Sequence, residues 1–160
     1  MAEKIVLKTD SAEQSRDLGR KIGDKIKSPV LILLKGELGT GKTILAKGIA
    51  ESLGYKDELT SPTYNLVQEY QADQEIIHMD LYRLDNSEEL LEIGFEDYLS
   101  RDAVILIEWP EIAFSIIPAD FIYIEIIKTS ADTREIMLKG EGEDAEIFIE
   151  RLKKDADFGS

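Results

Sequence analysis

The sequence predicts an α/β fold, a three-layer sandwich built around a mixed, mostly parallel sheet. Two runs, Val30–Lys35 and Ala103–Ile107, are apolar almost throughout, as is typical of strands covered on both faces. Strand patterns and amphipathic helical patterns succeed one another along the chain, an order that favours helices packed on a sheet. A glycine-rich turn at 36–41 joins one strand to one helix. With 160 residues and no repeat or linker, we expect a single domain, 1–160.

The first half of the chain predicts two strands and two helices. Ile5–Leu7 reads as a short strand, and Ser11 with Gln14 has the form of a capping box that starts a helix. Gly19 and Gly23 lie beside the apolar stripe of that helix and would permit close packing against a neighbour. The apolar stripes are Leu18, Ile22 and Ile26 in the first helix, and Ala46, Ile49, Ala50 and Leu53 in the second.

The second half predicts a hairpin, two short helices, three strands and a final helix. Tyr64–Tyr70 and Glu75–Met79 form the hairpin, whereas Phe121–Ile127 and Arg134–Leu138 alternate in the manner of edge strands. The remaining predicted elements are helices at Glu88–Ile93 and Phe95–Leu99, the strand Ala103–Ile107, a helix at Asp144–Lys153 and a flexible tail at 154–160.

Composition excludes several classes of protein. The chain has 33 acidic against 19 basic residues and a net charge of −14, so we expect no strong nucleic-acid affinity of its own. It has no cysteine, which excludes disulfides and thiolate metal sites. Its aliphatic runs are far shorter than the roughly 20 residues of a membrane span, and the first residues carry no apolar signal core. A cytoplasmic protein without membrane contact is therefore expected.

Residues 36–43 read GELGTGKT and fit the phosphate-loop pattern G-x-x-x-x-G-K-[ST]. Glycines let successive backbone N–H groups curl around an anion, and the following helix adds partial positive charge. Lys42 is expected to reach the β- and γ-phosphates, and the Thr43 hydroxyl to bind Mg²⁺. The sequence thus predicts a nucleotide-binding site. Glu37 occupies a free position of the pattern, where its side chain can face solvent.

Two acidic residues directly follow predicted strands, where a second carboxylate near Mg²⁺ is expected. Glu108 is the expected metal ligand, and Asp80 is either a site residue or a polar strand end. His78, the single histidine, lies two residues before Asp80 and so shares its face. It could tune Asp80, hold a nucleotide-dependent loop or be a structural histidine. Arg83 could be an arginine finger or a surface ion-pair partner.

Four segments together resemble the TsaE (formerly YjeE) family, bacterial ATPases of tRNA threonylcarbamoyladenosine synthesis. They are Gly36–Thr43, Ser61–Val67 (SPTYNLV), His78–Arg83 (HMDLYR) and Ile107–Pro110 (IEWP). The last three are not general features of phosphate-loop proteins, and the resemblance covers about residues 5–140 in the same order.

The resemblance implies a Mg·ATP site and a role for each part of it. Thr43 and Glu108 would hold Mg²⁺, Lys42 and Asp80 would be catalytic, and Asp80 would orient the attacking water or act as a base. The ATP contacts so implied are Ser11, Ala12, Gly36, Leu38, Gly39, Thr40, Gly41, Lys42, Thr43, Asp80, Thr133 and Arg134, of which Ser11, Ala12, Thr133 and Arg134 would flank the adenine. The residues grouped as switch or partner positions are Ser61, Pro62, Thr63, Tyr64, His78, Arg83 and Trp109.

The resemblance also implies partners. Family members work with a TsaD–TsaB heterodimer that transfers threonylcarbamoyl to adenosine 37 of tRNA, and ATP hydrolysis supports repeated turnover without itself transferring the group. RNA contact would then belong to the partners, in agreement with the acidic composition.

Three other readings compete with this one. A small-molecule kinase would be expected to carry an arginine-rich lid, whereas Glu111–Asp120 contains neither Arg nor Lys. A GTP-dependent switch would carry an N-K-x-D motif, which is absent. A structural subunit with a vestigial site would not be expected to keep Lys42, Thr43, Asp80 and Glu108.

Overall fold

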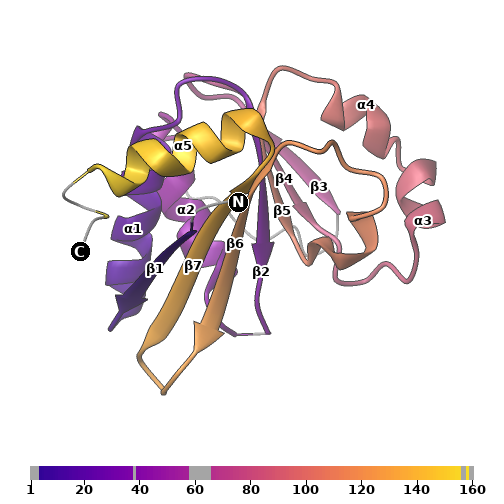
Figure 1. The fold of residues 1–160 in the computed structure, drawn as a ribbon. Helices are drawn as coiled ribbons and strands as arrows, with labels where there is room; N and C mark the ends of the chain where they lie inside the picture. Colours follow the sequence, from indigo (N-terminus) through magenta and orange to yellow (C-terminus); the bar gives the residue numbers. More distant parts are fainter. Residues whose placement is uncertain (1–3, 38, 58–65, 156–157, 159–160) are drawn as a thin grey trace.

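The computed structural model describes residues 4–37, 39–57, 66–155 and 158, and its centre is a seven-stranded sheet (Figure 1). The strands lie in the order β1-β7-β6-β2-β5-β4-β3. Within it, β2 is parallel to both β5 and β6, and β4 is parallel to β5, whereas β3 and β7 run against their neighbours. The strands are β1 Lys4–Thr9, β2 Val30–Lys35, β3 Val67–Tyr70, β4 Ile76–Asp80, β5 Val104–Glu108, β6 Phe121–Lys128 and β7 Arg134–Glu141.

Helices cover the two faces of the sheet unequally, as Figure 1 shows. One core lies under α1, α2 and α5, and the other lies between the β2-β5-β4 part of the sheet and the short helices α3, α4 and η1. The expected three layers are therefore present, and the mixed sheet was predicted correctly. The helices are α1 Ala12–Asp24, α2 Lys42–Ser52, α3 Ser87–Glu92, α4 Phe95–Leu99, η1 Pro110–Ala113 and α5 Glu143–Lys153.

Glycines on α1 and α2 bring these two helices into close contact. A Cβ atom on Gly19 would lie 2.3 Å from the Leu45 carbonyl oxygen, and one on Gly48 would lie 2.0 Å from that of Arg16. No side chain fits in such a space, so the close packing expected of Gly19 is confirmed. This contact fixes the helix that follows the glycine-rich turn against the body of the protein.

Two expectations about the second half need correction. β6 and β7 are not edge strands, because β7 lies between β1 and β6 and β6 lies between β7 and β2. Their alternation arises because helices cover only one of their faces. Within the segment expected to be a flexible tail, Phe158 is buried in the α1–α2–α5 core and Asp155 pairs with Lys25 at 2.7 Å. No helix in the described part of the chain is both long and apolar enough to cross a membrane.

Candidate functional site

The glycine-rich turn between β2 and α2 adopts the backbone that its sequence requires. Gly39 and Gly41 have φ angles of +81° and +100°, a region that side chains with a Cβ rarely adopt. Gly41 is also the N-cap of α2, so the turn leads directly into the first backbone N–H groups of that helix. Leu38 lies outside the described residues. The geometry is that of a loop able to surround an anion.

Lys42 is buried at the mouth of this loop although it carries a charge. Its ammonium group donates to the Gly36 carbonyl oxygen and, at 3.3 Å, to that of Glu37. The same Nζ lies 3.9 Å from the centre of the Trp109 ring. Burial lowers the pKa of Lys42, and the negative charges of Glu108 and Asp80 oppose that shift.

Glu108 ends β5 directly beside the start of α2, and its side chain is almost completely buried. The Thr43 hydroxyl lies 3.2 Å from each of its two carboxylate oxygens. His78, fully buried on β4, lies with Nε2 2.5 Å from Glu108 Oε2. The structure therefore brings Thr43 and Glu108 together as predicted, and it places His78 on Glu108.

Asp80 ends the neighbouring strand and is level with Glu108 in the β4–β5 register. Its Oδ1 accepts a hydrogen bond of 3.0 Å from the Tyr82 backbone N–H. Burial raises the pKa of Asp80, and the nearby Glu108 charge raises it further, while the Tyr82 bond opposes both. Asp80 is thus a half-buried carboxylate at the carboxyl ends of the strands, on the same side of the molecule as Glu108, Thr43 and Lys42.

Arg134, expected beside an adenine, is joined to the loop itself. Its Nε donates to the Thr40 carbonyl oxygen at 2.9 Å. The β1–β7 register pairs Thr9 with Arg134, so the start of α1 lies near the start of β7. The hydroxyl of Ser11 caps α1 by accepting from the Gln14 N–H at 3.1 Å, and that of Thr133 lies 2.7 Å from the Ser130 hydroxyl.

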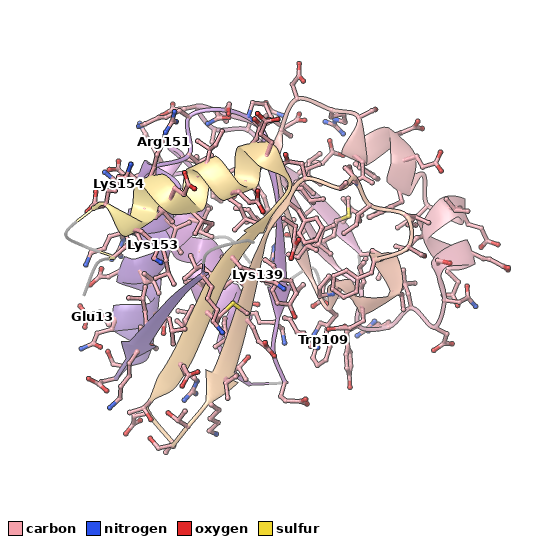
Figure 2. The ribbon with its side chains drawn as sticks, in the orientation of Figure 1. Glu13, Trp109, Lys139, Arg151, Lys153 and Lys154 are labelled. Atoms are coloured by element: carbon pink, nitrogen blue, oxygen red, sulfur yellow. The ribbon has the colours of Figure 1, made fainter. Side chains whose placement is uncertain are left out.

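Two aromatic residues close one side of the site. Trp109 has a φ of +58°, the only positive value at a described residue other than glycine, and its ring lies 4.8 Å from that of Tyr82. Figure 2 shows Trp109 at the end of the sheet toward which β2 points. A cavity of about 490 Å³ lies beside the loop, lined in part by Gly36, Thr40 and Trp109.

Some predicted positions remain outside this constellation. Ser61, Pro62, Thr63 and Tyr64 lie outside the described residues, and Arg83 is exposed beyond the end of β4. Sequence reasoning missed three contacts, namely His78 with Glu108, Arg134 with the loop carbonyl, and Lys42 with the Trp109 ring. The spacing of His78 and Asp80 did signal a shared face. The β4–β5 register, however, pairs His78 with Leu106, and only the side-chain hydrogen bond identifies Glu108 as its partner.

The donor set fits a phosphate with a divalent cation. The Thr43 hydroxyl, the Glu108 carboxylate and the Lys42 ammonium group meet beside the N-terminus of α2. The described residues form no cluster of three or more His, Cys, Asp or Glu that could hold a metal alone. Mg²⁺ typically takes one or two protein ligands and completes its shell with phosphates and water. Thr43 and Glu108 are the described residues suited to hold it.

Fold and site together define an α/β protein of the P-loop NTPase-like class. The family model described as "Threonylcarbamoyl adenosine biosynthesis protein TsaE" matches residues 9–136, so the chain belongs to the TsaE family, proteins of tRNA threonylcarbamoyladenosine biosynthesis. The TsaE protein of Bacillus subtilis is 30% identical over 148 residues, which cover 92% of each chain. That of Haemophilus influenzae is 43% identical over 98 residues, but these cover only 61% of this chain and 62% of the relative.

A solved structure supports the same assignment. The crystal structure of YdiB from Bacillus subtilis matches 96% of this chain and 97% of its own, with a TM-score of 0.80 and 27% sequence identity. The fold class expected from the sequence is therefore confirmed.

Proposed function

We propose that this chain is a P-loop ATPase that hydrolyses Mg·ATP in support of tRNA threonylcarbamoyladenosine synthesis. The observation that carries the proposal is the meeting of Lys42, Thr43, Glu108 and Asp80 at one sheet edge, beside a glycine turn with left-handed backbone. Membership of the TsaE family supports the role in this pathway, and the site residues support the proposed ATP hydrolysis.

Binding uses groups that are already in place. The backbone N–H groups of the loop and of the first turn of α2 bind the phosphates, and Arg134 keeps the loop in shape through the Thr40 carbonyl. Lys42 exchanges its carbonyl acceptors for phosphate oxygens, a favourable exchange for a buried cation. Thr43 and Glu108 would hold Mg²⁺, which would supply positive charge to screen the phosphates.

Hydrolysis requires a water aligned with the γ-phosphorus. The water oxygen forms a bond to that phosphorus while the bond to the β–γ bridging oxygen breaks, and Asp80 orients the water and accepts its proton. A raised pKa suits this role, because it makes the Asp80 carboxylate a stronger base than an ordinary aspartate. Lys42 stabilises the charge that develops on the phosphoryl oxygens.

The alternative candidate is a small-molecule kinase, in which a substrate hydroxyl replaces the water. Residues 111–120, which form most of η1 and the connection to β6, contain no Lys or Arg to close over the phosphates. This favours water as the acceptor, and nothing in the described residues favours a particular metabolite.

We further propose a TsaD–TsaB-type complex as partner, with tRNA reached only through that complex in the cytoplasm. The switch segment Ser61–Tyr64 and the segment Asp80–Arg83 would form the nucleotide-sensitive docking surface. Tyr82 supports this assignment, because its side chain is 58% exposed while its ring packs on Trp109 at the nucleotide site.

The decisive experiment measures ATP hydrolysis by this chain alone, and again with a TsaD–TsaB pair and tRNA. We expect Mg²⁺-dependent release of phosphate that rises in the presence of the complex, and repeated rounds of tRNA modification only when the chain is present. Transfer of phosphate to a metabolite in place of water would support the kinase. Absence of both nucleotide binding and hydrolysis would contradict an enzymatic role.

A further inference from the structure

His78 occupies a position that packing alone does not explain. It is fully buried on β4, on the same face as Asp80, and its Nε2 lies 2.5 Å from Glu108 Oε2. Neighbouring side chains on this face of the strands, Ile76, Val104 and Leu106, are aliphatic and belong to the core under α1 and α2. Among these neighbours, the imidazole of His78 is the side chain that carries polar atoms, and it lies against Glu108.

The hydrogen-bond geometry fixes the direction in which His78 acts. Its Nδ1 is buried with no partner among the described residues, and a proton there would leave an unsatisfied donor. The favoured neutral tautomer therefore carries its proton on Nε2 and donates to Glu108. One carboxylate oxygen is in this way held from the β4 side.

The other side of the same carboxylate faces Thr43, whose hydroxyl lies 3.2 Å from both oxygens. A hydroxyl that donates its proton to Glu108 keeps its lone pairs directed elsewhere, available to a cation. His78, Glu108 and Thr43 are thus joined by successive hydrogen bonds, and each residue orients the next. The last residue of this series is the threonine of the phosphate loop.

We propose that His78 is a positioning residue, which orients Glu108 and, through it, Thr43 for binding of the divalent cation. The inference rests on the proposed Mg·ATP site. It assigns His78 a role different from tuning Asp80, because the structure gives the histidine a hydrogen bond to Glu108. Partners that orient metal ligands are typically worth about 10- to 100-fold in metal affinity.

The test compares substitutions that differ in reach. The amide of Gln extends to the place of Nε2 and can still donate to Glu108, whereas Asn is one bond shorter and Leu has no donor. The quantity measured is the Mg²⁺ advantage, defined as the affinity for a non-hydrolysable ATP analogue with Mg²⁺ divided by its affinity in EDTA. Calorimetry supplies both affinities for each variant.

We expect His78→Leu and His78→Asn to lower the Mg²⁺ advantage about tenfold with little change in EDTA, and His78→Gln to retain most of it. Ser52→Ala serves as a control. Ser52 lies at the far end of α2 and donates to the Arg20 carbonyl oxygen, so its loss should leave the Mg²⁺ advantage unchanged. A fully retained advantage in His78→Leu would overturn the positioning role while leaving the proposed ATPase intact. A wild-type protein that binds the analogue equally well with and without Mg²⁺ would overturn both.

A measurement on the wild-type protein keeps the inference testable if the buried substitutions prevent folding. The sequence contains one histidine, so the ¹⁵N spectrum of histidine-labelled protein reports His78 alone. We expect a protonated Nε2 and an unprotonated Nδ1, with a larger shift of Nε2 on adding Mg²⁺ and analogue than on adding analogue in EDTA. A proton on Nδ1 with none on Nε2, or resonances that ignore Mg²⁺, would contradict the proposal.

Discussion

The carboxyl ends of β4 and β5 lie side by side in one sheet yet place their carboxylates in different surroundings. Asp80 and Glu108 are paired in the register, and both contribute negative charge near Lys42. Glu108 is buried and hydrogen-bonded by two side chains, His78 and Thr43. Asp80 has one backbone hydrogen bond and a pKa raised chiefly by burial.

The difference teaches that equal placement by the sheet does not imply equal function. A carboxylate held on both sides is suited to a fixed task such as holding a cation. A carboxylate with few partners and a raised pKa is suited to accepting a proton during a reaction. Four measurements can separate these two roles or show that the separation is wrong.

The largest effect is expected from Asp80→Asn. An amide keeps the acceptor for the Tyr82 N–H but cannot accept a proton, so kcat should fall by about 10²- to 10⁴-fold. Affinity for a non-hydrolysable analogue should be largely unchanged, because the role belongs to the transition state. Steady-state kinetics and calorimetry measure both quantities. Normal turnover in this variant would refute the base role.

Lys42→Ala should come next, because it removes an ammonium group that lies near both carboxylates. Loss of the charge that meets the phosphates should lower kcat by about 10²- to 10³-fold and also weaken nucleotide affinity. Calorimetry checks the affinity, and the fluorescence of Trp109, the only tryptophan, checks the loss of the ammonium group at 3.9 Å. Unchanged ATP affinity would mean that Gly36–Thr43 is not the binding site.

Glu108→Gln should act on the cation and leave the nucleotide in place. We expect the Mg²⁺ advantage in binding to fall by about 10- to 100-fold, with affinity in EDTA retained. Asp80→Asn is the matched comparison, since it changes a carboxylate to an amide at the paired position. If the two variants lost Mg²⁺ dependence equally, the distinction between the strand ends would disappear.

The smallest effect concerns the pKa of Asp80 itself. Burial raises this pKa and the Glu108 charge adds to it, so Glu108→Gln should lower it. Because folding raises the pKa, the contribution of Asp80 to the free energy of unfolding is greatest in acid and is lost as pH rises through the raised pKa. Carbon NMR of the Asp80 carboxyl group in the ligand-free protein measures the shift. An unchanged or higher pKa in Glu108→Gln would show that the two strand ends do not interact.

The sequence predicted much of this arrangement because its signals are local. The apolar run of β2, the glycine turn and the capping residue Ser11 each act within a few positions, and the corresponding elements lie where expected. Phe121–Ile127 was misread as an edge strand because alternation records only which face is covered, not where a strand lies in the sheet.

The missed site contacts depend on strand register and on distant segments. His78 and Glu108 are 30 residues apart, and Arg134 lies 94 residues beyond Thr40. No pattern within β4 or β7 reveals which residue of another element will be opposite. The composition of each strand was sufficient to locate both strands in the sequence. Identifying Glu108 as the partner of His78 required the structure.

The hydrogen bond from Arg134 to the Thr40 carbonyl oxygen has a consequence for how the protein folds during its synthesis. The glycine turn leaves the ribosome early, but the arginine that holds it follows only after most of the chain has been synthesised. The central strand β2 likewise cannot pair until β5 and β6 have been synthesised, and these strands begin at residues 104 and 121. During synthesis the nascent chain therefore exposes an apolar strand beside an unfinished loop, a state prone to aggregation until the last third of the chain folds.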